Sequence, residues 1–379
     1  MKLIHLADLH IGKKVNEFSM LEDQKYILNQ VLDMIDKIQP DAVMIAGDVY
    51  DKPIPPTEAV ELFDSFLYRL SKRNLQVFII SGNHDSPERL AFGNRLIDES
   101  GIHISPVFNG KVKIHSLKDE YGNVNIFMLP FLKPAQVRRF YPDKEIKSYT
   151  DALRAVIDEI DINPSERNII ITHQFVTGAQ TSDSEELSVG GTDNVDASIF
   201  NQFDYVALGH LHRPQKIGSE KIRYSGTPLK YSFSEAKDKK SLSLVEMKEK
   251  GNISITEFPF TPKHEMVEIR GTYDELVSKK FYENTTLQED YVHITLTDEQ
   301  DIPDAISKLR VIYHNLMKLD YDNTRTRHQG QINGVADVET KSPLELFNEF
   351  YEKQNGTFMN EEQTNYVTDL IEKIWEDAQ

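Results

Sequence analysis

Five short apolar runs near the N-terminus each end in residues that bind divalent cations, and this repetition constrains the fold more than any other feature. The runs, rich in Val, Ile, Leu and Ala, are Leu3–Ala7, Ala42–Ala46, Val77–Ile80, Asn168–Thr172 and Tyr205–Leu208. Unbroken apolar runs of this length predict buried strands that are covered on both faces. Because sites of layered α/β folds form where strands end at one edge of a sheet, we expect all five ends to converge.

The residues that follow these runs are a mixed set of nitrogen and oxygen ligands. They are Asp8-Leu9-His10, Gly47-Asp48, Gly82-Asn83-His84-Asp85, His173 and Gly209-His210-Leu211-His212. Carboxylate, imidazole and amide oxygen without sulfur suit borderline cations such as Mn, Fe or Zn. The pairs Asp8/His10 and His210/His212 are spaced i, i+2, so in an extended strand end both members are expected to point the same way.

The number of ligands predicts two cations. Seven are too many for one tetrahedral site: Asp8, His10, Asp48, Asn83, His173, His210 and His212. We predict two metals that share Asp48, roughly 3.5–4 Å apart, with a bridging water or hydroxide that attacks phosphorus. His84 is expected to project elsewhere and to act as the general acid, because an imidazole titrates near working pH. Asp85 and His5 are expected to orient the ligand residues.

Each of these residues also has an ordinary explanation. Asp8 and Asp48 alone suit a helix cap or a turn. A single His173 suits a hydrogen-bonded core histidine, Asn83 suits a turn, and Asp85-Ser86-Pro87 suits a helix start. None of these explanations accounts for the recurrence of polar residues at successive strand ends.

The motif order resembles the calcineurin-like metallophosphoesterase family, whose pattern reads D-x-H, G-D, G-N-H-[DE], a lone H and G-H-x-H. The resemblance implies that Asp8, His10, Asp48 and His212 hold one metal. It implies that Asp48, Asn83, His173 and His210 hold the other. The implied α/β fold is a four-layer sandwich, in which two β-sheets are flanked by helices, with a small α/β capping domain and C-terminal helices.

Longer segments are similar to the SbcD branch of that family: His5–Gly12, Ala46–Asp51, Ser81–Ser86, Ala207–Arg213 and Tyr224–Leu229. This resemblance implies a Mn-dependent DNA exonuclease and endonuclease that processes double-stranded ends, hairpins and single strands in repair and recombination. It also implies a homodimer and a partner, the long coiled-coil ATPase SbcC. Archaeal and eukaryotic relatives carry a histidine shortly after Gly-Asp, where this chain has Asp51-Lys52, so that histidine's role in positioning duplex ends does not carry over.

Composition bounds the function. The 379 residues include no cysteine, which excludes disulfides and thiolate metal sites. The N-terminus shows no signal peptide and no run reaches membrane-spanning length, so we expect a cytoplasmic protein without a membrane partner. The net charge of −18 disfavours DNA binding by the whole chain. Either local basic groups compensate, or the ATPase supplies most of the affinity for DNA. The basic groups, for which ordinary solvated surface is the alternative, are Lys13-Lys14, Arg89 with Arg95, Lys133 with Arg138-Arg139, and Arg213 with Lys216.

The pattern along the chain predicts four parts. These are a nuclease domain at 1–260, a capping domain at 264–322, a polar linker at 323–341 and partner-binding helices at 342–379. Within the first, the polar stretch Thr177–Asp196 is expected to be a substrate-facing loop, with a plain flexible insertion as the alternative.

The C-terminal helices carry apolar stripes at helical spacing. One contains Leu344, Phe347, Phe350 and Tyr351, and the other contains Tyr366, Val367, Leu370, Ile371, Ile374 and Trp375. Two short helices beyond a linker hardly form a core alone. They are expected to dock on the ATPase in the helix-in-groove manner, and docking within the chain is the alternative.

Two other classes of function compete with the nuclease. A phosphatase or cyclic-nucleotide phosphodiesterase would keep the site but would not need the C-terminal parts. A structural subunit that tethers DNA ends would not need the site.

Overall fold

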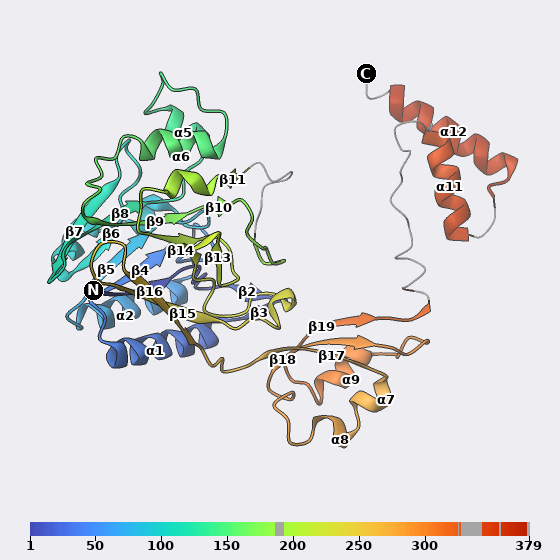
Figure 1. Cartoon of the computed structure of the whole chain (residues 1–379). Coiled ribbons are helices and arrows are strands. Elements are labelled where there is room, and N and C mark those ends of the chain that lie inside the picture. The colour runs from blue at the N-terminus through green and yellow to red at the C-terminus, as the bar shows by residue number, and fades with distance from the viewer. Residues whose placement is uncertain (186–192, 325, 327–342, 356–357, 377–379) are drawn as a thin grey trace. The chain divides into compact units, whose positions relative to one another are not determined.

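The computed structural model describes residues 1–185, 193–324, 326, 343–355 and 358–376 (Figure 1). Two six-stranded sheets make up most of the chain before Pro259. In spatial order, the first sheet contains β16 (Ile253–Pro259), β15 (Ser241–Met247), β1 (Lys2–Leu6), β4 (Ala42–Ala46), β5 (Gln76–Ile80) and β6 (Ile102–Ile104). The second contains β13 (Gln215–Ile217), β14 (Ser219–Tyr224), β12 (Tyr205–Gly209), β9 (Arg167–His173), β8 (Gly122–Leu129) and β7 (Lys113–Asp119).

The two sheets pack face to face through a core of fully buried side chains. Ala46 and Ile80 from the first sheet lie in this core with Ile126 and Ile171 from the second. Helices cover the outer faces, so the predicted four-layer α/β sandwich is confirmed. Apart from His5, Asn168 and Thr172, the runs are apolar because each strand meets a sheet on one side and a helix on the other.

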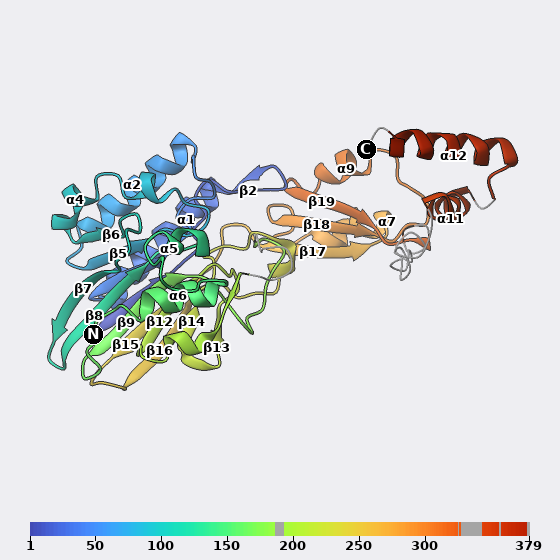
Figure 2. The same cartoon turned by 90° about the horizontal axis from the view of Figure 1, so that it is seen from above.

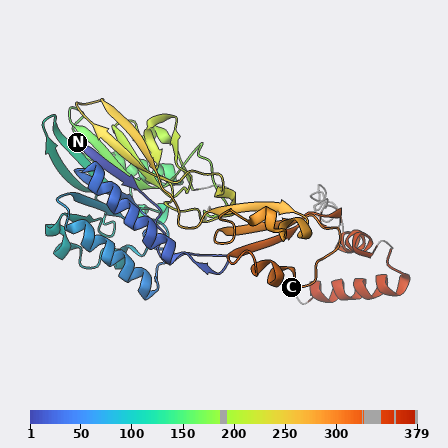
Figure 3. The ribbon, with the colours of Figure 1, turned by 90° about the horizontal axis from the view of Figure 1, so that it is seen from below.

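Amphipathic helices make the outer layers. On the first sheet lie α1 (Leu21–Ile38) and α2 (Thr57–Ser71), which are seen side by side in blue in Figure 3. In α1, Ile27, Val31 and Ile35 recur at helical spacing and are buried. The second sheet is covered by α6 (Tyr149–Ile157), with the shorter α5 (Pro134–Arg138) beside it (Figure 2).

Strand direction brings the predicted ligands to one edge. The strands β1, β4, β5 and β6 are parallel, and so are β8, β9, β12 and β14. The strands β1, β4, β5, β9 and β12 therefore deliver the residues that follow them to the same rim of the sandwich.

Shorter elements fill the connections. They are the pairs β2 (Lys14–Val15) with β3 (Phe18–Ser19) and β10 (Phe175–Val176) with β11 (Asn194–Val195), and the helices α3 (Pro87–Leu90) and α4 (Asn94–Ile97). The stretch Thr177–Asp196, expected to be a loop, begins directly after β10 and contains β11 near its end. Residues 186–192 of that stretch lie outside the described residues.

A small sheet follows Pro259. It contains β17 (Met266–Gly271), β18 (Tyr291–Leu296) and β19 (Leu316–Tyr321), with the short helices α7 (Tyr273–Leu276), α8 (Lys279–Tyr282) and α9 (Ala305–Arg310). The chain divides into two compact units, one of Met1–Thr295 with Pro303–Asp320 and one of Leu296–Ile302 with Tyr321–Gln379. The second unit holds α11 (Pro343–Asn355) and α12 (Glu361–Glu376).

The four predicted domain boundaries remain predictions. Most of the expected linker lies outside the described residues, including its basic residues Arg325, Arg327 and His328. Ser342, the first residue of the predicted C-terminal helical segment, also lies outside them. Among the helices that the structure describes, none is long and apolar enough to cross a membrane.

Candidate metal centre

Left-handed turns, rather than extended strand ends, orient the side chains of Asp8 and His10. The strand β1 ends at Leu6, and Asp8 and His10 have φ of 54° and 44°. The expectation that this i, i+2 pair lies in extended backbone was wrong. The turn lets the Asp8 and His10 N–H groups donate to the carbonyls of Gly47 (3.1 Å) and Asp48 (2.9 Å). Positive φ is costly for residues other than glycine and is concentrated at functional sites.

Two motif glycines are required by close approach of the chain. A Cβ on Gly82 would lie 2.1 Å from Asp48 Oδ1, and a Cβ on Gly209 would lie 1.9 Å from the Ala46 carbonyl oxygen. Any side chain at either position would therefore push the two loops apart. The glycines before Asn83 and His210 allow the ligand-bearing segments of both sheets to meet.

One group of side chains gathers around His10. Its Nε2 lies 3.1 Å from His212 Nε2 and 3.6 Å from Asp48 Oδ2. Burial lowers the pKa of both imidazoles, so they offer lone pairs at neutral pH. Asp8 Oδ2 is buried and has no hydrogen-bond partner among the described residues. A buried carboxylate oxygen without a partner is costly unless a cation binds it.

A second group gathers around Asn83. Its Oδ1 lies 2.9 Å from His173 Nε2 and 2.8 Å from His210 Nδ1. His173 Nε2 is also 3.3 Å from Asp48 Oδ2. Burial opposes charge on His173, but the nearby carboxylates of Asp48 and Asp8 outweigh it and raise the pKa of His173 to about 9. The same Asp48 oxygen therefore faces both groups.

His84 stands at the edge of this site. Its backbone N–H donates to Asp48 Oδ1 (2.9 Å), and its Nδ1 lies 3.0 Å from the Asp51 carbonyl oxygen. Because a carbonyl only accepts, Nδ1 carries the hydrogen. Nε2 is 4.0 Å from Asp48 Oδ2, so the ring lies closer to the ligands than the sequence suggested, with its side chain partly exposed.

The hydrogen bonds of Asp85 and His5 go to backbone groups and to the Tyr205 hydroxyl rather than to the predicted ligand side chains. Asp85 accepts hydrogen bonds from the N–H groups of Val49 (3.1 Å), Tyr50 (3.0 Å) and Gly82 (2.9 Å), which ties the loop of Asp48 to the loop of Asn83. His5 on the first sheet lies 2.9 Å from the Tyr205 hydroxyl and 3.2 Å from the Leu208 carbonyl on the second.

A buried polar network around His212 was not predicted from the sequence. Ser184 Oγ lies 2.5 Å from His212 Nδ1 and donates to Glu235, which is fully buried and paired with Lys240. Glu185 accepts from the His212 N–H (2.7 Å). Ser184 and Glu185 belong to the predicted loop stretch, but Glu235 and Lys240 adjoin no motif, so only the fold reveals them.

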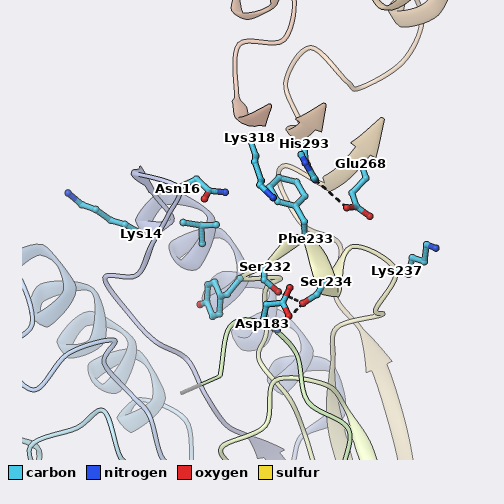
Figure 4. Close-up of a pocket in the computed structure, with 12 residues that line it drawn as sticks. Lys14, Asn16, Asp183, Ser232, Phe233, Ser234, Lys237, Glu268, His293 and Lys318 are labelled. Carbon is cyan, nitrogen blue, oxygen red and sulfur yellow. Dashed lines mark hydrogen bonds and ion pairs between the residues drawn. The ribbon is translucent and has the colours of Figure 1, made fainter. Parts of the chain in front are cut away.

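A cleft of about 580 Å³ adjoins the site (Figure 4). Tyr231 connects the two, since it lines the cleft while its ring centroid lies 5.8 Å from that of His10. Lys14, Lys237 and Lys318 also line the cleft, together with the carboxylates of Asp183 and Glu268. Lys318 pairs with Asp320 (2.8 Å), so the lining is polar and of mixed charge.

The chain matches two family profiles. The profile described as calcineurin-like phosphoesterase matches residues 1–214, and the one described as type 5 capsule protein repressor C-terminal domain matches residues 262–355. Two solved structures share 11% identity over 68% of this chain. A dimetal phosphatase from Danio rerio is covered over 95% of its length with a TM-score of 0.41, and a Thermus thermophilus protein over 98% with 0.37. These scores are too low to support a conclusion.

Two curated relatives match end to end. The SbcD subunit of the SbcCD nuclease of Staphylococcus epidermidis is 32% identical over 380 residues, which is 99% of each chain. The protein of the same name from Staphylococcus saprophyticus is 33% identical over 388 residues, which is 100% of each. The chain therefore belongs to the calcineurin-like phosphoesterases and, within them, to the family of the SbcD subunits of SbcCD nucleases.

Proposed function

We propose that this protein is a nuclease subunit that hydrolyses DNA phosphodiester bonds with two divalent cations, of which Mn is the expected one. The observation that carries the proposal is the position of Asp48, whose Oδ2 lies 3.6 Å from His10 Nε2 and 3.3 Å from His173 Nε2. A carboxylate between two nitrogen-rich groups is what a dinuclear site requires. The names of the curated relatives support the reaction class.

The side chains present fit two cations. Asp8, His10, Asp48 and His212 would hold one, and Asp48, Asn83, His173 and His210 would hold the other. The buried Asp8 Oδ2 would gain the partner that it lacks. The lowered pKa values of His10, His210 and His212 keep lone pairs available. The set contains no sulfur, which suits Mn better than soft cations.

The chain's own residues would orient His84 and protonate the leaving oxygen. When bound, the cations supply Lewis-acid stabilisation of the phosphate and an activated water. The Asp51 carbonyl holds the His84 ring through Nδ1, which leaves Nε2 facing the site. His84 is therefore placed to hold a proton at Nε2 and to give it to the departing 3′ oxygen.

The C-terminal helices would bind the ATPase partner SbcC. Exposed apolar side chains lie on both α11 and α12: Phe350 is 57% exposed, Tyr366 70% and Leu370 46%. A hydrogen bond of 3.0 Å from Gln363 to the Tyr351 hydroxyl joins the two helices. These three side chains of the stripes are exposed in the isolated chain, which favours a partner as the docking surface.

The ATPase partner would also supply much of the affinity for DNA. Several of the predicted basic residues are already engaged: Lys13 pairs with Asp51 (2.8 Å), Arg213 with Asp238 (3.0 Å), and Lys216 with Glu220. These pairs reduce the charge available for phosphates. Lys14 and Lys237 of the adjoining cleft would then be the chain's own contribution to DNA binding, together with any homodimer contacts.

The test is cleavage of an end-labelled DNA duplex by the purified chain with added Mn. We expect Mn-dependent cutting that is lost in Asp48→Ala and kept in Asp36→Ala, which removes an exposed carboxylate paired with Arg73. Hydrolysis of small phosphoesters without DNA cutting by the metal-loaded chain and partner would favour a phosphatase. Full DNA repair in cells that carry Asp48→Ala would favour a tethering role.

A further inference from the structure

A second cluster of histidine and carboxylate side chains lies away from the rim, at the side of the sandwich where β6 and β7 are the edge strands of the two sheets (Figures 1 and 2). His103 belongs to β6, His115 belongs to β7, and Asp98 lies in the short 3-10 helix Asp98–Ser100. The two imidazole ring centroids are 4.1 Å apart. One ligand atom from each of the three residues lies within 4.8 Å of the others.

His115 presents a nitrogen without a partner. Its Nε2 is buried and makes no hydrogen bond among the described residues. Burial is the main cause of the pKa of His115 being lowered to about 4, and nearby His103 and Lys113 add to it. The ring is therefore neutral at physiological pH and has a lone pair to offer.

The other two residues have an ordinary explanation, which leaves His115 unexplained. His103 Nδ1 lies 2.7 Å from Asp98 Oδ1, and its Nε2 lies 2.8 Å from Gln76 Oε1. Lys113 Nζ is 3.0 Å from the same Asp98 oxygen. An ion-pair network accounts for these contacts. It does not account for a buried imidazole nitrogen of His115 beside them, which would be costly without a ligand.

We propose that Asp98, His103 and His115 bind a single transition-metal cation of the Zn²⁺ class. Two imidazoles and a carboxylate are a common zinc set, with a fourth position open to water. The cation would replace the Nδ1 proton of His103 and the contact of Lys113, whose side chain is 29% exposed and free to turn to solvent.

The site would act as a cross-link. In the described part of the chain no backbone pairing joins β6 to β7, because they belong to different sheets. A cation held by both strands would tie these two edges together and stabilise the folded state by binding to it alone. This cross-link does not depend on the proposed nuclease function.

The experiment is zinc binding to the chelator-treated full chain, with bound zinc counted by mass spectrometry and thermal unfolding followed with and without Zn²⁺. We expect His115→Gln and Asp98→Asn each to bind one zinc fewer per chain than wild type, with a smaller zinc-induced rise in melting temperature. His314→Gln, which removes an exposed histidine beside Glu289 (3.5 Å), should match wild type.

The variants distinguish the proposed zinc site from the metal centre that contains Asp48. His115→Gln should retain Mn-dependent DNA cutting, whereas Asp48→Asn should lose cutting and keep the zinc at the β6/β7 edge. Equal zinc content in wild type, His115→Gln and Asp98→Asn, with equal shifts in melting temperature, would overturn the proposal and leave the nuclease proposal untouched.

Discussion

At the scale of single residues, a substitution of His84 tests the cleavage step separately from metal binding. His84→Gln removes the imidazole that the Asp51 carbonyl orients but leaves the predicted ligands in place. We expect Mn binding to persist while the cleavage rate falls by roughly 10²–10⁴-fold, the usual contribution of a general acid. Calorimetric Mn titration beside single-turnover cleavage checks this. Loss of Mn from the variant would instead make His84 a ligand.

Ser184 offers a test of the network behind His212. Its hydroxyl stands between His212 Nδ1 and the buried Glu235. Residues that orient a metal-binding histidine typically change metal affinity by 10–100-fold. We expect Ser184→Ala to raise the Mn concentration for half-maximal cleavage by roughly 10-fold and to leave the rate at saturating Mn nearly unchanged. The matched control is Ser165→Ala, which removes an exposed hydroxyl that contacts Asn163 (2.7 Å) and has no contact with His212. An unchanged Mn requirement would exclude the positioning role.

At the scale of elements, the sequence predicted the strands and their convergence but not the turns that complete the site. Apolar runs identified β1, β4, β5, β9 and β12 because a strand that is buried on both faces has apolar residues at nearly every position. The left-handed backbone of Asp8 and of Asp48, whose φ is 48°, was not predictable, since aspartate suits several turn conformations. The place of Glu235 and Lys240 in the network around His212 was not predicted for another reason. No local sequence pattern links them to His212, and only tertiary packing brings them close to it.

The C-terminal elements carry the next prediction. Deleting Pro343–Gln379 removes α11 and α12, which contribute none of the predicted ligands. We expect Mn-dependent hydrolysis by the isolated chain to be preserved and association with SbcC to be lost, because the exposed stripe of Phe350, Tyr366 and Leu370 goes with the helices. Co-purification of the two tagged proteins measures this. Retained association would place the contact elsewhere, and the helices would then serve docking within the chain.

At the scale of the whole molecule, two features combine: an acidic chain and a site at the junction of two sheets. The fold explains the site, because both sheets deliver parallel strand ends to one rim. The net charge of −18 explains why the chain would need a partner to hold a polyanion. Composition indicated this need, whereas the cleft lined by Lys14, Lys237 and Lys318 became visible only in the folded chain.

The central claim is that one carboxylate, Asp48, joins two cations. Electron paramagnetic resonance of the Mn-loaded chain tests it most directly, because two Mn²⁺ ions that share a bridging ligand couple magnetically. We expect the spectrum of a coupled pair in wild type and only isolated Mn²⁺ signals in Asp48→Asn. Isolated signals in wild type at saturating Mn, with cleavage intact, would contradict the shared site.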